Sequence, residues 1–331
     1  EFVLNKTGLA IDPYFVAPKI SWLKNQYPAL PKSAVITTTD TWLIYKLTKQ
    51  YVTDMATASR TLLFDLATMG WQQQLADIWQ LDINDLPTLV GNDQVIGEIN
   101  CPELPSLQGV RLTAAIVDQA AALFAQNCFT SGQAKCTYGT GAFLLTNIGN
   151  QIKISKNGLA TSLAWQIKGA TSYYLDGQVF TAASAVDWLL SNKFIERLSD
   201  IDLLPDSSGV MASPSFAGIG APLWRPDATA TISGLGLNQT KQHIASAVVD
   251  GIAAGIRANQ VEVSQRANVI PNNLASGFGE ARDTAFVDID VPADVTDAAM
   301  TSAFAFHDNR YGFVGDALRR TSVRFGWEAV T

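Results

Sequence analysis

The stretch that most constrains the fold of this chain runs from Thr113 to Phe143. An apolar run, residues 114–117, is followed by the polar pair Asp118-Gln119 and then by an alanine-rich segment, residues 120–125. The first run is typical of a buried strand and the second of a helix, so Asp118 is predicted at a strand-to-helix joint. A carboxylate there can accept hydrogen bonds from the first helical turn, and the helix dipole favours its charged form. From these residues alone, capping and chemistry are equally open roles for Asp118.

A second motif follows the predicted helix. In Thr137-Tyr138-Gly139-Thr140-Gly141, two glycines bracket a threonine within strand-like sequence. Glycines permit a positive φ and a close backbone approach, and the N–H groups and hydroxyl of such a turn suit a phosphate. The bare pattern is also that of an ordinary hairpin turn. Both interpretations stay open on the pattern alone.

Composition excludes several classes of protein. Of the 331 residues 47% are hydrophobic and 16% charged, which is typical of a globular protein of roughly two domains. A net charge of −7 argues against a nucleic-acid partner, because binding a phosphate backbone needs clustered Lys and Arg. An apolar run of about 18 residues is missing, so we expect no membrane span. The three cysteines and two histidines form no metal-ligand spacing and no even disulfide framework, which favours a cytoplasmic location and no protein-held metal.

Periodicity predicts an α/β fold. Helices are expected over residues 18–25, 41–47, 118–127, 182–191 and 240–263, with one or two more between 70 and 86. Strands in tandem are expected over residues 134–137, 142–148, 160–167 and 171–175. The turn at Ser131-Gly132 is taken as the boundary between two domains, residues 1–130 and 131–331. Gly251 and Gly255 in the last helix would let another element pack close.

Two side chains outside the main stretch have open roles. Arg60, in the segment of residues 53–65 that is rich in small polar residues, is interpreted as one member of a structural ion pair. Tyr14 precedes the first predicted helix, and it is either a packing aromatic or a ring that lines a cleft.

Several segments, in one order, resemble the FGGY family of carbohydrate kinases, and within it the glycerol kinases. They are Thr7–Leu9, Asp12–Phe15, Lys19–Leu23, Asp40–Ile44, Ala58–Thr61, Asp118–Phe124, Thr137–Gly141 and Ala230–Asp250. In the family, a phosphate-binding hairpin and a substrate-binding Arg-Glu pair precede the position of Thr7. We therefore expect the first domain to be incomplete in this sequence.

The resemblance implies an actin-like ATPase fold, with two α/β domains of ribonuclease H type. It also implies that ATP with Mg²⁺ phosphorylates a hydroxyl of glycerol or of a related small polyol or sugar. Homo-oligomer formation is compatible with this. Two alternatives stay open: another FGGY sugar kinase, of the xylulose, ribulose or gluconate type, and a catalytically silent relative that binds a ligand or partner.

The resemblance also implies roles for individual residues. Asp118 would take the proton from the attacking hydroxyl, as a modest base in a reaction that depends mainly on positioning. Tyr14 and Gln119 would bind substrate hydroxyls, and Phe143 would pack on the carbon skeleton. The nucleotide would be bound by four further residues: Gly139, Thr140, Gly277 and Gly279.

Replacing Asp118 by Asn is expected to lower turnover by about 10²–10⁴-fold, the usual contribution of a placed proton acceptor. The fold should persist, because the amide oxygen still accepts hydrogen bonds at the helix start. Phosphorylation rates and thermal unfolding of the full-length Asp118→Asn protein check both parts. Turnover close to wild type would exclude Asp118 as the base.

Overall fold

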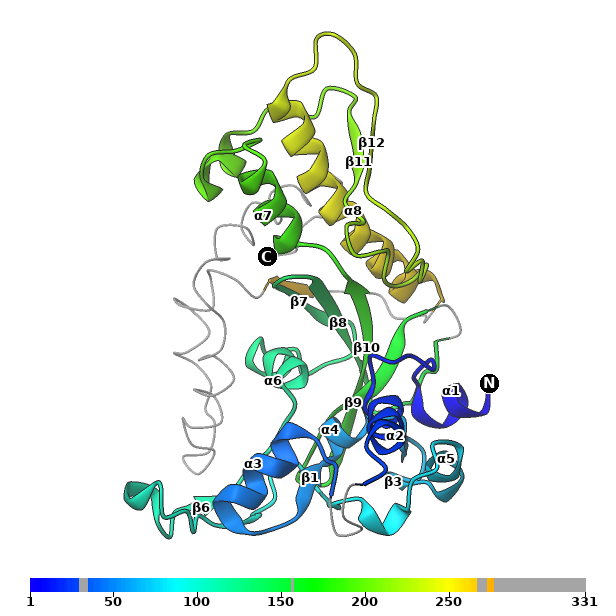
Figure 1. Ribbon diagram of the computed structural model, residues 1–331, viewed down its shortest axis with the longest axis vertical. Coiled ribbons are helices and arrows are strands. Elements are labelled where there is room, and N and C mark those ends of the chain that lie inside the picture. Colours follow the sequence, from blue (N-terminus) through cyan, green and yellow to red (C-terminus); the bar gives the residue numbers. More distant parts are fainter. Residues whose placement is uncertain (30–34, 156–157, 267–272, 277–331) are drawn as a thin grey trace.

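The computed structural model describes residues 1–29, 35–155, 158–266 and 273–276. A five-stranded sheet lies at its centre in the order β13-β7-β8-β10-β9 (Figure 1). The strands are β7 (Gln133–Tyr138), β8 (Ala142–Gly149), β9 (Ala160–Ile167), β10 (Ala170–Val179) and β13 (Asn273–Ser276). Strand β13 runs parallel to β7, and the other pairs are antiparallel.

Short elements make up the part of the chain before the sheet. The helices are α1 (Phe2–Thr7), α2 (Val16–Gln26), α3 (Thr39–Thr48), α4 (Met55–Ala58), α5 (Gln73–Ile78) and α6 (Asp118–Ala125), with 3-10 turns at Ile83–Asp85 and Pro105–Leu107. Strand β1 (Val52–Asp54) pairs parallel with β4 (Thr88–Val90). Two antiparallel pairs follow, β2 (Phe64–Asp65) with β3 (Gly70–Trp71) and β5 (Gly97–Glu98) with β6 (Arg111–Leu112).

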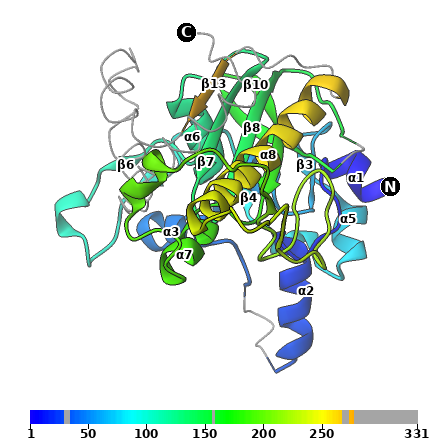
Figure 2. The ribbon, with the colours of Figure 1, turned by 90° about the horizontal axis from the view of Figure 1, so that it is seen from above.

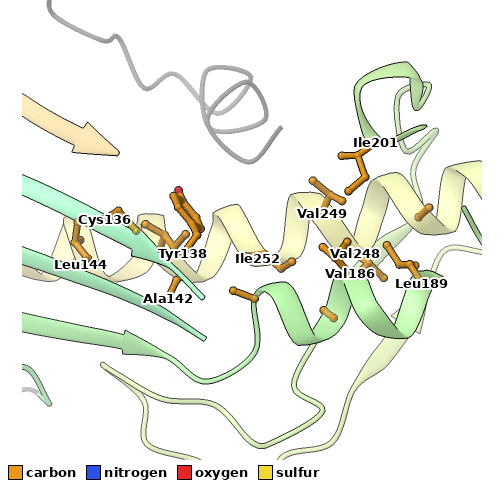
Figure 3. Packing of buried hydrophobic residues seen from close by; sticks show 14 of the residues in the cluster. Cys136, Tyr138, Ala142, Leu144, Val186, Leu189, Ile201, Val248, Val249 and Ile252 are labelled. Carbon is orange, nitrogen blue, oxygen red and sulfur yellow. The ribbon is translucent and has the colours of Figure 1, made fainter. Parts of the chain in front are cut away.

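The part after β10 supplies the helices of the largest apolar core. These are α7 (Ala183–Ser191) and α8 (Lys241–Arg266), joined by a 3-10 turn at Leu198–Leu203 and the pair β11 (Met211–Ser213) and β12 (Thr231–Ser233). Side chains of β7, β8, α7 and α8 interlock there, with Tyr138 and Ile252 near its middle (Figure 3). None of the helices in the described ranges is long and apolar enough to cross a membrane.

The two faces of the sheet are covered differently, because successive side chains of a strand point to opposite faces. On β8, Leu144 belongs to the core with α7 and α8, whereas Phe143 and Leu145 pack with α6. Figure 2 shows α8 on one side of the sheet and α6 on the other. We call these the α8 face and the α6 face.

Most elements lie where the sequence predicts them, and the α/β expectation is confirmed. One prediction is wrong: residues 113–117 form no strand, and helix α6 follows directly at Asp118. This segment does not pair with a neighbouring strand but forms hydrogen bonds with one asparagine, Asn92. The Asn92 amide donates to the carbonyl of Ala115 at 2.8 Å, and the Ala115 N–H donates to the carbonyl of Asn92 at 3.3 Å. The apolar run is buried only in part, because it covers α6 rather than the interior of a sheet.

A buried ion pair attaches the N-terminal elements to the sheet. The Arg60 guanidinium lies 3.0 Å from the Asp176 carboxylate of β10 and donates to the Ser162 hydroxyl of β9 at 3.1 Å. Only 14% of the Arg60 side chain and 3% of the Asp176 side chain are exposed. The interpretation of Arg60 as a structural ion-pair member is confirmed, and its partner lies on the central sheet.

The two glycines of α8 predict opposite effects of the same substitution. A Cβ on Gly251 would lie 2.4 Å from the carbonyl oxygen of Ala212 in β11, whereas one on Gly255 would meet the Val179 methyl groups at 3.5 Å. Gly251→Ala is therefore expected to destabilise by about 1–3 kcal/mol through overpacking. Gly255→Ala should stabilise by up to about 1 kcal/mol through helix propensity. Urea denaturation of both variants measures this, and equal shifts in the two would contradict it.

Removing the Asp176 charge is expected to be costly. Asp176→Asn would leave the Arg60 guanidinium buried without a counter-charge, which destabilises by about 3–5 kcal/mol. The matched control is Asp227→Asn in the Arg225–Asp227 pair, whose two side chains are 62% and 68% exposed. That change should have little effect, because water screens the pair. Urea denaturation measures the free energy of unfolding of both variants. A similar decrease in stability in the two would contradict this prediction.

Candidate active site

Charged and polar side chains gather on the α6 face of the sheet. On β7, Lys135 and Thr137 alternate with Cys136, which faces α7 and α8, so both point to the α6 face. On β10, Asp176 pairs with Leu145 and Gln178 pairs with Phe143, so these two side chains share that face. A sheet that is apolar on one side thus carries a buried polar surface on the other.

Lys135 is the most unusual member of this surface. Its side chain is fully buried, and its Nζ donates to Gln119 Oε1 at 2.5 Å and to Thr137 Oγ1 at 2.7 Å. Burial lowers the pKa of Lys135 to about 8, although the carboxylates of Asp176 and Asp118 favour the charged form. Such a lysine is held by its partners, because a buried charge without them is costly.

Asp118 and Gln119 begin helix α6 at the edge of this surface. The Asp118 side chain is exposed, and its Oδ1 accepts the N–H of Gln119 at 2.8 Å. Val117 is the N-cap, so Asp118 is the first helical residue and not the cap. Its carboxylate still lies at the positive end of the helix.

Two aromatic rings lie beside Arg60, the partner of Asp176. The Arg60 guanidinium lies 6.0 Å from the centre of the Tyr14 ring and 5.2 Å from that of Phe15. The Tyr14 side chain is 48% exposed. Asp118 and Asp176 both act electrostatically on the Tyr14 hydroxyl. The structure thus brings Tyr14 to the same polar surface as Asp118.

Asp176 has an unused acceptor on this surface. Its Oδ2 accepts from Arg60, and the Gln178 amide is 3.3 Å from the same oxygen. Its Oδ1 is buried and has no hydrogen-bond partner among the described residues. Phe143 lies next to Gln178 in the neighbouring strand and packs with the cluster of α6.

The turn Gly139–Gly141 joins β7 to β8 just beyond Thr137. The Gly139 N–H donates to the carbonyl of Gly141 at 2.8 Å, which closes the turn, and Thr140 is exposed at its tip. A Cβ on Gly139 would meet only the Gly141 carbonyl oxygen, at 3.8 Å, whereas one on Gly141 would lie 2.5 Å from the carbonyl of Val179. Gly139 therefore keeps one side of the backbone open, which fits a phosphate oxygen.

Two further glycines are expected at the nucleotide. Gly277 and Gly279 lie outside the described residues. Strand β13, which precedes them in the chain, lies beside β7. In the described ranges, groups of three or more metal-ligating side chains do not occur. Mg²⁺ in kinase sites is commonly held by one or two carboxylates together with substrate phosphates.

Sequence reasoning missed Lys135 and Asp176. Each is the one charged residue of its strand, and a buried lone charge indicates a paired or functional group. That signal was present in the sequence at both positions. Their partners, Gln119 and Arg60, come from other elements, so only the three-dimensional structure reveals the contacts.

Family models match the two parts of the chain in order. Residues 1–125 match the N-terminal domain of the FGGY family of carbohydrate kinases, and residues 134–289 match its C-terminal domain.

Relatives with this similarity include two glycerol kinases. That of Myxococcus xanthus is 42% identical over 265 residues, which cover 76% of this chain and 53% of the relative. That of Carboxydothermus hydrogenoformans is 35% identical over 329 residues, which cover 92% of this chain and 65% of the relative. The chain thus spans between about half and two thirds of the length of these relatives.

Solved structures share the fold. The crystal structure of Plasmodium falciparum glycerol kinase with ADP has a TM-score of 0.79 and 34% identity, covering 86% of this chain and 59% of that chain. The xylulose kinase of Lactobacillus acidophilus, with a TM-score of 0.74 and 20% identity, covers 99% of this chain and 67% of its own and supports the fold alone. The expected actin-like, ribonuclease H-like fold is confirmed. The chain belongs to the FGGY family of carbohydrate kinases.

Proposed function

We propose that the full-length protein transfers the γ-phosphoryl group of ATP to a hydroxyl of glycerol or of a related small polyol or sugar. One observation carries the proposal. The exposed carboxylate of Asp118 begins α6 beside the polar surface of Lys135, Thr137 and Asp176, and the glycine turn at Thr140 ends the strand that bears Lys135. This arrangement supports a proton acceptor at the start of α6 and a phosphate contact at the turn that ends β7.

The reaction follows from these positions. The substrate hydroxyl oxygen forms a bond to the γ-phosphorus as the bond to the β,γ-bridging oxygen breaks, and ADP leaves. The hydroxyl proton passes to the Asp118 carboxylate. Transfer of this kind depends on positioning and charge stabilisation more than on a strong base. The exposed Asp118 can play this part because, among the described residues, its carboxylate accepts a hydrogen bond from its own helix alone, the N–H of Gln119.

Other residues would position the substrate. Gln119 and Tyr14 bind its hydroxyls, and Phe143 packs against its carbon skeleton. The likeness to glycerol kinases supports glycerol as the first substrate to test. The partner of the protein is then a small-molecule substrate. We propose a cytoplasmic location, where ATP is available.

The nucleotide would lie at the other end of β7. Its phosphates would contact Gly139 and Thr140, and Gly277 and Gly279 would supply further contacts to the nucleotide. Bound Mg²⁺ would neutralise charge on the phosphate oxygens. We further propose that the two domains divide at residues 130 and 131, within the turn that precedes β7.

The test is a phosphorylation assay on the purified full-length protein with ATP and Mg²⁺. Glycerol is expected to be phosphorylated with a higher kcat/KM than xylulose, ribulose or gluconate, which are run in parallel. Asp118→Asn serves as the inactive control. A preference for one of the sugars would reassign the substrate. Phosphorylation of none of the four, with ATP bound, would overturn the proposal in favour of a catalytically silent binding protein.

A further inference from the structure

We propose that Lys135 is a positioning residue of this site, whose ammonium group holds the amide oxygen of Gln119 so that the amide NH₂ faces the substrate as a donor. The inference rests on the proposed function, since it assigns the neighbour of Asp118 to the substrate. It starts from the contact of Lys135 Nζ with Gln119 Oε1 at 2.5 Å.

The chemistry of the two groups fixes the orientation. An ammonium group has three donors and no acceptor, whereas an amide has an oxygen acceptor on one side and two N–H donors on the other. Only the oxygen of Gln119 can therefore face Lys135, and the NH₂ must point away from it. Gln119 then presents donors alone to a ligand, beside an Asp118 carboxylate that presents acceptors alone.

Asp118 and Gln119 then have complementary roles toward the substrate. Asp118 accepts the proton of the reacting hydroxyl, and Gln119 donates to a lone pair of a substrate oxygen. A substrate with neighbouring hydroxyls satisfies both, because a hydroxyl donates and accepts at once. Turning the Gln119 amide over would set two acceptors side by side and lose the second contact.

Burial makes the arrangement rigid. The Lys135 side chain is fully buried, and its second partner, Thr137 Oγ1 at 2.7 Å, lies on the same strand. The groups that act on its charge are the carboxylates of Asp118 at the start of α6 and Asp176 on β10, together with the thiols of Cys136 and Cys128. Because the ammonium group is buried, it must stay within hydrogen-bonding distance of Gln119 and Thr137, and few other positions satisfy both contacts.

A double-mutant cycle on the full-length protein tests this. Lys135→Met, which keeps the length of the side chain, is expected to raise the KM for glycerol about tenfold, the size of one lost hydrogen bond, with kcat changed less. Gln119→Ala should raise the KM to a similar extent. In the Gln119→Ala background, adding Lys135→Met should have almost no further effect, because there is no amide left to orient.

Two more measurements separate positioning from a merely structural role. The wild-type KM for glycerol should rise as the pH passes about 8, where Lys135 loses its proton and can accept as well as donate, and the KM of Lys135→Met should lack this step. Lys46→Met, at an exposed lysine of α3, is the matched control and should leave all constants unchanged.

A further measurement does not depend on enzyme activity. The side-chain NH₂ signals of Gln119 in the NMR spectrum, identified by their loss in Gln119→Ala, should move in Lys135→Met to the values of a solvent-exposed glutamine. Unchanged signals, or an equal effect of Lys135→Met in both backgrounds of the cycle, would overturn the inference. If wild type phosphorylates none of the substrates tested, the proposed function fails, and the NMR arm alone still decides the role of Lys135.

Discussion

Two opposite charges buried on one face of the central sheet are the constraint on which the rest of the structure depends. Lys135 on β7 and Asp176 on β10 are removed from water, and a buried charge is tolerated only when it is paired and hydrogen-bonded. Asp176 is paired with Arg60 through one of its two oxygens, and Lys135 is hydrogen-bonded to Gln119. Each partner comes from a different element outside the sheet. Satisfying the charges therefore also docks the N-terminal segment and helix α6 on the sheet.

The start of α6 is held from two directions. Lys135 binds Gln119 from the sheet, and Asn92 binds the segment just before Asp118 from the β1–β4 side, where its amide also donates to Asp54 at 2.9 Å. The Asn92 side-chain oxygen accepts the N–H of Gln166 on β9 at 2.7 Å. One asparagine thus links β1, β9 and the approach to Asp118. The exposed carboxylate at the helix start thus lies between two anchored neighbours, Ala115 before it and Gln119 after it.

The sequence alone predicts what local pattern encodes. The bounds predicted for β7, β8 and β9 are close to the observed ones, because turn residues separate runs of strand length. The strand predicted over residues 171–175 is longer than expected, since β10 continues to Val179. Residues 114–117 were predicted as a strand and are not one, since an apolar run has the same appearance whether a sheet or a helix covers it. Arg60 was correctly placed in an ion pair, but no local pattern identifies a partner 116 positions further along the chain. The hydrogen bond between Gln119 and Lys135 depends on the register of the sheet and on the position of α6. Neither can be inferred from a single segment of the sequence.

The hydrogen bonds at the first turn of α7 limit how the glycine turn can meet an anion. A helix start usually offers free N–H groups to a phosphate. Here the N–H groups of Ala182 and Ala183 donate to the carbonyls of Thr140 and Gly139 at 2.9 and 3.0 Å, and that of Ser184 donates to Thr140 at 3.3 Å. Those donors are already used to fix the turn. An anion bound at this place would therefore contact the turn itself, at the open side of Gly139 and the exposed side chain of Thr140, rather than the N–H groups of α7, which hold the turn in shape.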